Sequence, residues 1–124
     1  DMFQDMYLLA LLQKGASGDP CAVSPAQALQ IATENGARAQ GREDCGAIKQ
    51  GNKADLVVVD VDQPHLHPAT DLASNLVYAA HGSDVVLTMV DGAVLYRDGE
   101  WPTIDVERAE AETDAAFKRI IARL

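Results

Sequence analysis

Aromatic side chains make up only 5% of this 124-residue sequence. Basic side chains are scarce as well, since 10 Lys and Arg stand against 19 Asp and Glu, which gives a formal net charge of -9. Stacking platforms for bases and clustered cations for phosphates are therefore both in short supply. The composition argues against nucleic acid and against an anionic membrane surface as partners.

Cysteine and long apolar runs are also rare. Cys21 and Cys45 lie far apart with no CxxC spacing, so neither a zinc knuckle nor a redox pair is indicated. No apolar run approaches the roughly 18 residues that span a bilayer, and no basic region followed by an apolar stretch opens the sequence. We expect two free thiols in a reducing compartment, and hence a soluble, cytoplasmic protein.

The sequence contains no GxSxG, no HExxH and no glycine-rich phosphate loop followed by GK. Hydrophobic residues make up 48%, which is enough for a packed core built from Ala, Val, Leu and Ile. A complete eight-fold β/α barrel takes roughly 250 residues and cannot fit in this chain. The residues by themselves predict a mixed α/β segment.

Two helices are predicted in the first third of the chain. Residues 2–14 are apolar around most of the helix circumference, so neighbours should bury this helix on more than one side, and Gly15 is its predicted C-cap. Residues 25–34 begin with a capping box and a proline at the first helical position. We expect this helix to end near Asn35 and Gly36, with a short further turn that Gly41 closes.

The rest of the chain changes from helical to extended and back. Residues 54–62 are rich in valine and predict a largely buried strand, and residues 71–80 predict a short helix. Residues 84–91 and 93–97 predict a hairpin around Asp91 and Gly92, with a second turn at Asp98 and Gly99. Residues 105–124 predict a last helix, with acidic residues early and basic residues late, as the helix dipole favours.

Three histidines are the one grouping that suggests a metal site. His65 and His67 form an HxH pair, with His81, Asp62 and Asp71 as further candidate ligands. Two prolines flank the pair, so it lies in a loop, where no strand pleat fixes the ligand geometry. Exposed loop histidines are the simpler interpretation, and the metal site is kept as a hypothesis.

Two stretches carry a resemblance to a known family. The run GAIKQGNKADLVVVDVDQPHL, residues 46–66, resembles a signature near the C-terminus of metal-dependent amidohydrolases. SPAQALQIATENGARAQG, residues 24–41, is similar to the helix that precedes that signature. The opening DMFQDMYLLALLQKG, PHLHP at residues 64–68 and LVYAAHGSDV at residues 76–85 resemble the branch that contains methylthioadenosine and S-adenosylhomocysteine deaminases and triazine chlorohydrolases. The resemblance extends from residue 1 to about residue 105.

The resemblance implies an α/β fragment of a larger enzyme. Residues 1–45 would supply the last helices of a (β/α)8 barrel, residues 46–104 part of a composite β-sandwich, and residues 105–124 a C-terminal helix. The sequence starts directly with helix-like residues, which fits such a fragment. The family holds zinc or iron through ligands that would all lie upstream of Asp1, and its HxH pair does not correspond to His65 and His67. No catalytic, cofactor-binding or metal residue is therefore carried over to this chain.

The function implied is hydrolysis of a C–N or C–Cl bond on a purine- or triazine-like ring, as in a deaminase, with this segment in a structural role. Sheet edges left unpaired promote association, so we expect the missing N-terminal part of the same enzyme as partner, or a homo-oligomer. The alternative is a non-catalytic assembly module that oligomerises through the hairpin and the last helix. A self-contained domain is a further possibility that the residues leave open.

Overall fold

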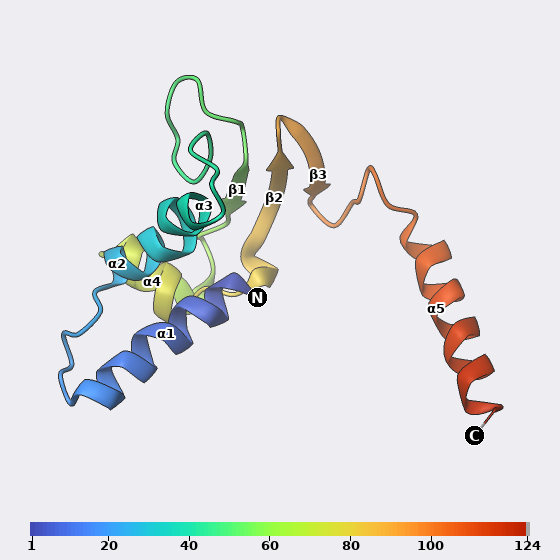
Figure 1. The fold of residues 1–124 in the computed structure, drawn as a ribbon, viewed down its shortest axis with the longest axis horizontal. Helices are drawn as coiled ribbons and strands as arrows, with labels where there is room; N and C mark the ends of the chain where they lie inside the picture. The colour runs from blue at the N-terminus through green and yellow to red at the C-terminus, as the bar shows by residue number, and fades with distance from the viewer. Residues whose placement is uncertain (124) are drawn as a thin grey trace.

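The computed structural model describes residues 1–123 and shows helices grouped at one end, a small sheet in the middle and a separate helix at the other end (Figure 1). In chain order the elements are α1 (Met2–Ser17), α2 (Pro25–Gln30), a π-helical turn (Ile31–Asn35), α3 (Gly36–Ala39), β1 (Leu56–Val59), a 3₁₀ turn (Pro64–Leu66), α4 (Leu72–Tyr78), a second 3₁₀ turn (Gly82–Asp84), β2 (Val85–Val90), β3 (Ala93–Arg97) and α5 (Val106–Ile121). Across these residues every helix is too short or too polar to span a bilayer.

Helix α1 is longer than predicted. It continues past Gly15 to Ser17, and Gly18 supplies the left-handed C-cap with φ 67°. A glycine within a helix is tolerated, whereas the left-handed conformation at a helix end strongly favours glycine, so the later glycine ends the helix. The Ser17 hydroxyl also donates to the carbonyl oxygen of Gln13 at 2.7 Å, which supports the last turn.

The second helical segment also differs from its prediction. The capping box at Ser24 and Gln27 is confirmed, but Gly36 does not end the helix, because its φ of -61° is helical. The π-helical turn absorbs an extra residue instead, and the helix runs on through α3. A Cβ at Gly36 would lie 3.2 Å from the carbonyl oxygen of Ile31, so glycine suits this widened turn. Gly41, with φ 73°, stands just beyond the end of α3.

The three strands form one antiparallel sheet in the order β1-β2-β3. The predicted hairpin is confirmed, since Asp91 and Gly92 both have positive φ, at 51° and 80°. The prediction of a largely buried strand at residues 54–62 is wrong. β1 is only four residues long and lies at the sheet edge, where Val57 and Val58 are 59% and 48% exposed.

A small apolar core lies where α1, α2 and α4 meet. Its buried members are Met6, Ala10, Ala28 and Val77, and partly buried side chains such as Phe3 pack around them. Only one side of α1 is covered by this core, because Leu8, Leu11 and Leu12 remain exposed. The expectation that neighbours bury α1 on more than one side is therefore not met by the described residues.

Gly46 allows the loop before β1 to lie against the π-helical turn. A Cβ at this position would come within 2.8 Å of both Glu34 Cα and the Thr33 carbonyl oxygen, and the φ of Gly46 is 82°. Gly51 in the same loop also has a positive φ, 92°, but open space surrounds it. A comparison of Gly46 with Gly51 therefore separates the effect of a left-handed backbone from the effect of close packing.

We predict that Gly46→Ala lowers the free energy of unfolding by about 1–3 kcal/mol more than Gly51→Ala does. Both variants carry the strain of a left-handed alanine, and only Gly46→Ala adds a collision with helix backbone. Urea unfolding of the two variants, followed by circular dichroism, measures the difference. Equal midpoints would show that the loop does not pack on the helix at Gly46.

Candidate functional site

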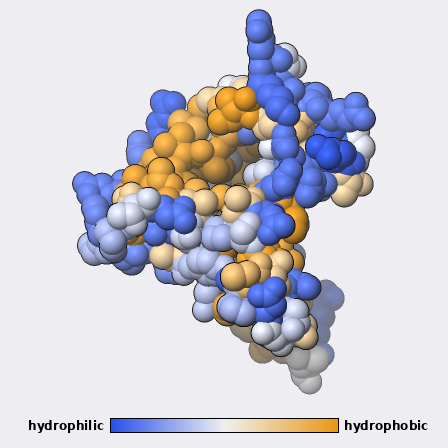
Figure 2. Space-filling model, turned by 90° about the vertical axis from the view of Figure 1, so that its left-hand side faces the viewer, coloured by the Kyte–Doolittle hydropathy of each residue, from blue (hydrophilic) through white to orange (hydrophobic). Residues whose placement is uncertain are grey.

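The surface carries an open apolar groove of about 630 Å³. Hydrophobic side chains gather around this hollow on the face that Figure 2 shows. Its walls come from α1, from α2 and the π-helical turn, from the loop before β1 and from β1 itself. Residues far apart in the sequence therefore share one apolar surface, which the described residues leave open.

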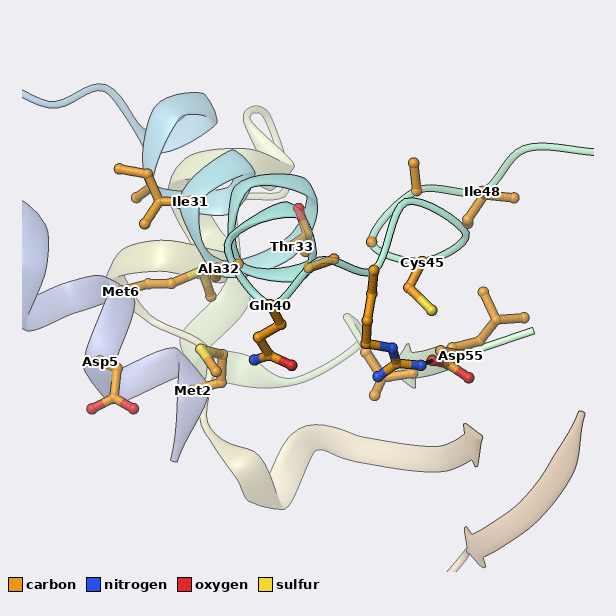
Figure 3. A pocket seen from close by; sticks show the side chains of 18 of the residues that line it. Met2, Asp5, Met6, Ile31, Ala32, Thr33, Gln40, Cys45, Ile48 and Asp55 are labelled. Atoms are coloured by element: carbon orange, nitrogen blue, oxygen red, sulfur yellow. Dashed lines mark hydrogen bonds and ion pairs between the residues drawn. The ribbon is translucent and has the colours of Figure 1, made fainter. Parts of the chain in front are cut away.

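The two ends of the groove differ in chemistry. Met2 and Met6 of α1 lie at one end near Ala32, whereas Cys45 and Asp55 lie at the other end (Figure 3). Carboxylates are few along the walls, and the side chain of Asp5 is one of them. The groove is suited to packing against apolar side chains, and it lacks the convergent polar groups of a small-molecule site.

The polar end of the groove is a closed set of hydrogen bonds. Arg42 Nη2 lies 3.0 Å from Asp55 Oδ2, and the backbone N–H of Asp91 donates to Asp55 Oδ1 at 2.7 Å. The Asp91 N–H, helped by Cys45 and Arg42, lowers the pKa of Asp55 despite partial desolvation. These contacts tie the loop at residue 42 to the hairpin, so they serve a structural purpose.

The Cys45 thiol belongs to the same set. It is buried, and its sulfur lies 3.3 Å from Asp44 Oδ1. Burial and the neighbouring carboxylates raise the pKa of the Cys45 thiol, which disfavours the thiolate. Because the thiolate is the reactive form, Cys45 is poorly suited to act as a nucleophile.

Of the three histidines, the structure brings two together. His65 and His81 stack with their ring centroids 5.4 Å apart and their planes 13° from parallel. His65 Nε2 lies 2.9 Å from Asp84 Oδ2, and the backbone N–H of His81 donates to the same oxygen at 2.8 Å. Asp84 is only 5% exposed, so this carboxylate joins both histidine segments beneath the surface. The His65 side chain is still 39% exposed, as predicted, but it pairs with a buried carboxylate, which was not predicted.

The other candidates of the predicted cluster lie apart from this pair. His67 Nε2 is 3.3 Å from Asp62 Oδ1, and that carboxylate is 94% exposed. Asp71 is the N-cap of α4 and accepts from the N–H groups of Ala73 and Ser74. The hypothesis of one site formed by His65, His67 and His81 is therefore not supported.

Sequence reasoning missed Asp84, although a signal was present. The run from His81 to Asp84 has the spacing at which a side chain reaches back three residues to a backbone N–H, as in a capping box. Asp1 makes a related link, because its Oδ1 accepts from the N–H of Phe3 at 2.9 Å and its Oδ2 from the N–H of Gly82 at 3.0 Å. The start of α1 is thereby held to the 3₁₀ turn that precedes β2.

Within residues 1–123, no group of three or more His, Cys, Asp or Glu side chains is placed to hold a metal ion. The buried carboxylate of Asp84 already accepts hydrogen bonds from His65 and from the backbone. Among the described residues, every buried side-chain oxygen or nitrogen has a hydrogen-bond partner. The residues present do not fit a catalytic metal.

Comparison with known proteins gives a consistent result. Residues 1–95 match the Amidohydrolase family. The chain is 50% identical over 113 residues to the 5-methylthioadenosine/S-adenosylhomocysteine deaminase of Moorella thermoacetica, a match that covers 90% of this chain and 26% of that protein.

Two solved structures resemble the fold. An adenosine deaminase from Xanthomonas campestris with bound zinc has a TM-score of 0.93 and 32% identity, covering 98% of this chain and 28% of that one. An atrazine chlorohydrolase from Arthrobacter aurescens complexed with zinc has a TM-score of 0.82 and 28% identity, covering 91% and 25%. The chain thus spans about a quarter of the length of the proteins it matches.

The Asp84 pair predicts a pH-dependent contribution to stability. Burial alone would raise the pKa of Asp84, but the hydrogen bonds from His65 and from the His81 N–H outweigh it and lower the pKa. A carboxyl whose pKa falls on folding stabilises the fold above its ordinary pKa, and this contribution is lost as the pH drops through the lowered value.

We therefore expect Asp84→Asn to lower the free energy of unfolding by about 1–3 kcal/mol at pH 7, and the difference from the unsubstituted chain to narrow below about pH 4. Urea unfolding at a series of pH values measures this. Asp62→Asn is the matched control, because its carboxylate also pairs with a histidine but is exposed. A deficit for Asp84→Asn that stays constant from pH 7 to pH 3 would contradict the assignment.

Proposed function

This chain belongs to the amidohydrolase family, and we propose that it is the C-terminal part of a cytoplasmic, metal-dependent enzyme that hydrolyses a C–N or C–Cl bond on a purine- or triazine-like ring. A deaminase is the form of this activity that we favour. Its similarity to a methylthioadenosine/S-adenosylhomocysteine deaminase, to an adenosine deaminase and to an atrazine chlorohydrolase supports this substrate class. The role of the segment itself is structural.

The apolar groove is the observation that carries this proposal. Proteins that work alone rarely leave a large contiguous apolar surface open to water, because its burial would release free energy. The chain also spans only about a quarter of the length of its relatives. We infer that the preceding part of the same enzyme packs into the groove, against Met2 and Ile31 among others.

The division of the chain follows from the same proposal. Residues 1–45 supply the last helices of a (β/α)8 barrel, residues 46–104 supply part of a β-sandwich that other strands complete, and residues 105–124 form a terminal helix. The short, exposed edge strand β1 supports the second assignment, because an edge strand has backbone groups free to pair. Assembly of the whole enzyme as a homo-oligomer stays a prediction.

The metal belongs to the rest of the enzyme in this proposal. Zinc, or iron in its place, would be held by residues outside this chain and would supply an activated water for the hydrolytic step. The residues of this chain take no part in that step. They hold the loops and helices in place, for example through the carboxylate of Asp1, which joins the start of α1 to Gly82.

A chimera tests the proposal. In the deaminase of Moorella thermoacetica, the segment matched by this chain is replaced by residues 1–124. We expect the chimera to bind zinc and to release ammonia from 5'-methylthioadenosine at a rate within roughly tenfold of the unaltered enzyme, since the replaced part would only support the site.

The controls are the 124-residue chain alone and the Moorella enzyme cut before the exchanged segment. Neither should release ammonia. Turnover by the isolated chain with added zinc would overturn the structural role. A well-folded chimera without any activity would overturn the assignment to this class of enzyme.

The groove itself is tested by Ile31→Asp. Ile31 is 42% exposed in this chain and lines the groove, so we expect the substitution to change the stability of the isolated chain by less than about 1 kcal/mol. In the chimera, where a carboxylate would be buried, the loss should reach about 2 kcal/mol or more. Thermal and urea unfolding of both proteins measure this.

Gln30→Asp is the control for Ile31→Asp, because the neighbouring Gln30 is exposed and does not line the groove. It should leave both proteins nearly unchanged. If Ile31→Asp affects the chimera no more than Gln30→Asp does, the groove is not the packing surface.

A further inference from the structure

Helix α5 exposes an apolar stripe that no other element covers. None of its residues is buried, and Phe117, Ile120 and Ile121 are 62%, 60% and 52% exposed. Figure 1 shows α5 standing apart from the sheet, at the opposite end of the molecule from α1 and α2. The segment that leads into it also exposes Trp101 and Ile104.

Local interactions alone support such a helix weakly. Asp105 caps it by accepting from the N–H of Arg108 at 3.0 Å, and Arg108 lies 3.6 Å from Glu112. A cap and one exposed ion pair each contribute little, and isolated helices of about this length are marginal in water. A defined α5 therefore requires a surface that buries the stripe.

The same placement of α5 occurs in a solved enzyme. The match to the Xanthomonas campestris adenosine deaminase covers 98% of this chain, so it includes α5. A helix that lacks a packing partner within its own segment, yet keeps its place in a second protein, is positioned by residues outside that segment.

The charges beside the stripe describe the surface that would receive it. At helical spacing, Glu107 and Asp114 lie on one border of the stripe together with Lys118, and Arg123 lies on the other border near Glu112, so both borders carry charges of both signs. A complementary surface is therefore an apolar strip whose borders can pair with charges of both signs.

We propose that α5 docks on the part of the same polypeptide that precedes Asp1, at a surface separate from the one that fills the groove. This inference rests on the proposed function, since it requires the chain to be the C-terminal part of a larger enzyme. α5 then acts as an arm that fastens the small sheet to the barrel from a second side. A second copy of the chain is the competing occupant.

Hydrogen exchange measured by mass spectrometry on the chimera tests the proposal. We expect the amides of residues 110–121 to exchange at least ~100-fold more slowly in the chimera than in the 124-residue chain, because docking suppresses fraying of the helix. The protection should be the same at low and high protein concentration. Protection that rises with concentration would overturn the proposal in favour of a second copy.

Two matched substitutions sharpen the test. Phe117→Asp places a carboxylate in the stripe and should remove at least ~10-fold of the protection. Ala115→Asp introduces the same side chain on the opposite face of α5 and should leave the protection unchanged. Equal effects of the two variants, or an unprotected α5 in the chimera, would overturn the docking.

The outcome is separable from that of the proposed function. An active chimera whose α5 exchanges freely would contradict the docking and leave the enzyme assignment in place. An inactive chimera with a protected α5 would contradict the assignment of activity and leave the docking in place.

Discussion

Burial of apolar side chains is the main driving force of folding, and in this chain it joins three helices through one small cluster. Met6 and Ala10 of α1 meet Ala28 of α2 and Val77 of α4, and this contact sets the positions of the three helices. The 3₁₀ turn that carries His65 is bonded to the turn that carries Asp84, and Asn75 of α4 and Asp1 at the start of α1 bond these turns to the helices. Every other part of the fold is attached to the cluster through loops or through the sheet.

The polar links and the apolar surfaces have different purposes. Arg42, Asp55 and Asp91 connect the loop before β1 to the hairpin, and Asp1 and Asp84 connect segments that are distant in the sequence. All of these groups are satisfied within the chain. The apolar groove and the stripe on α5 stay exposed to solvent, so the unmatched parts of this chain are apolar surfaces and not a reactive centre.

Local rules predicted the features that local interactions determine. The capping box at Ser24 and the hairpin at Asp91 and Gly92 follow from the hydrogen bonds and φ values of a few neighbouring residues. The sequence did not reveal which of two glycines ends α1, because Gly15 and Gly18 satisfy the same rule and the surrounding turns decide. The resemblance to amidohydrolases, which the comparison confirmed, came from motifs and not from periodicity.

Features that depend on distant partners were harder to predict. The exposure of Val57 and Val58 reflects what this chain places over β1, and three valines in a row cannot indicate that. Asp84 became visible as a link only when the fold brought His65 to it across 19 residues of sequence. The composition of a strand or a loop indicates which groups it can bury or bind. The neighbouring segments determine which of these contacts form.

The groove beside α1 has a consequence for biosynthesis. A ribosome makes a protein from its N-terminus, so in an enzyme that ends with these residues the partner surface would emerge and begin to fold before α1 leaves the exit tunnel. The apolar groove would then contact the surface that buries it almost as soon as the groove forms. If the same residues were translated from a separate message, the surface that buries the groove would not be present. The order of synthesis would then no longer protect these residues from aggregation.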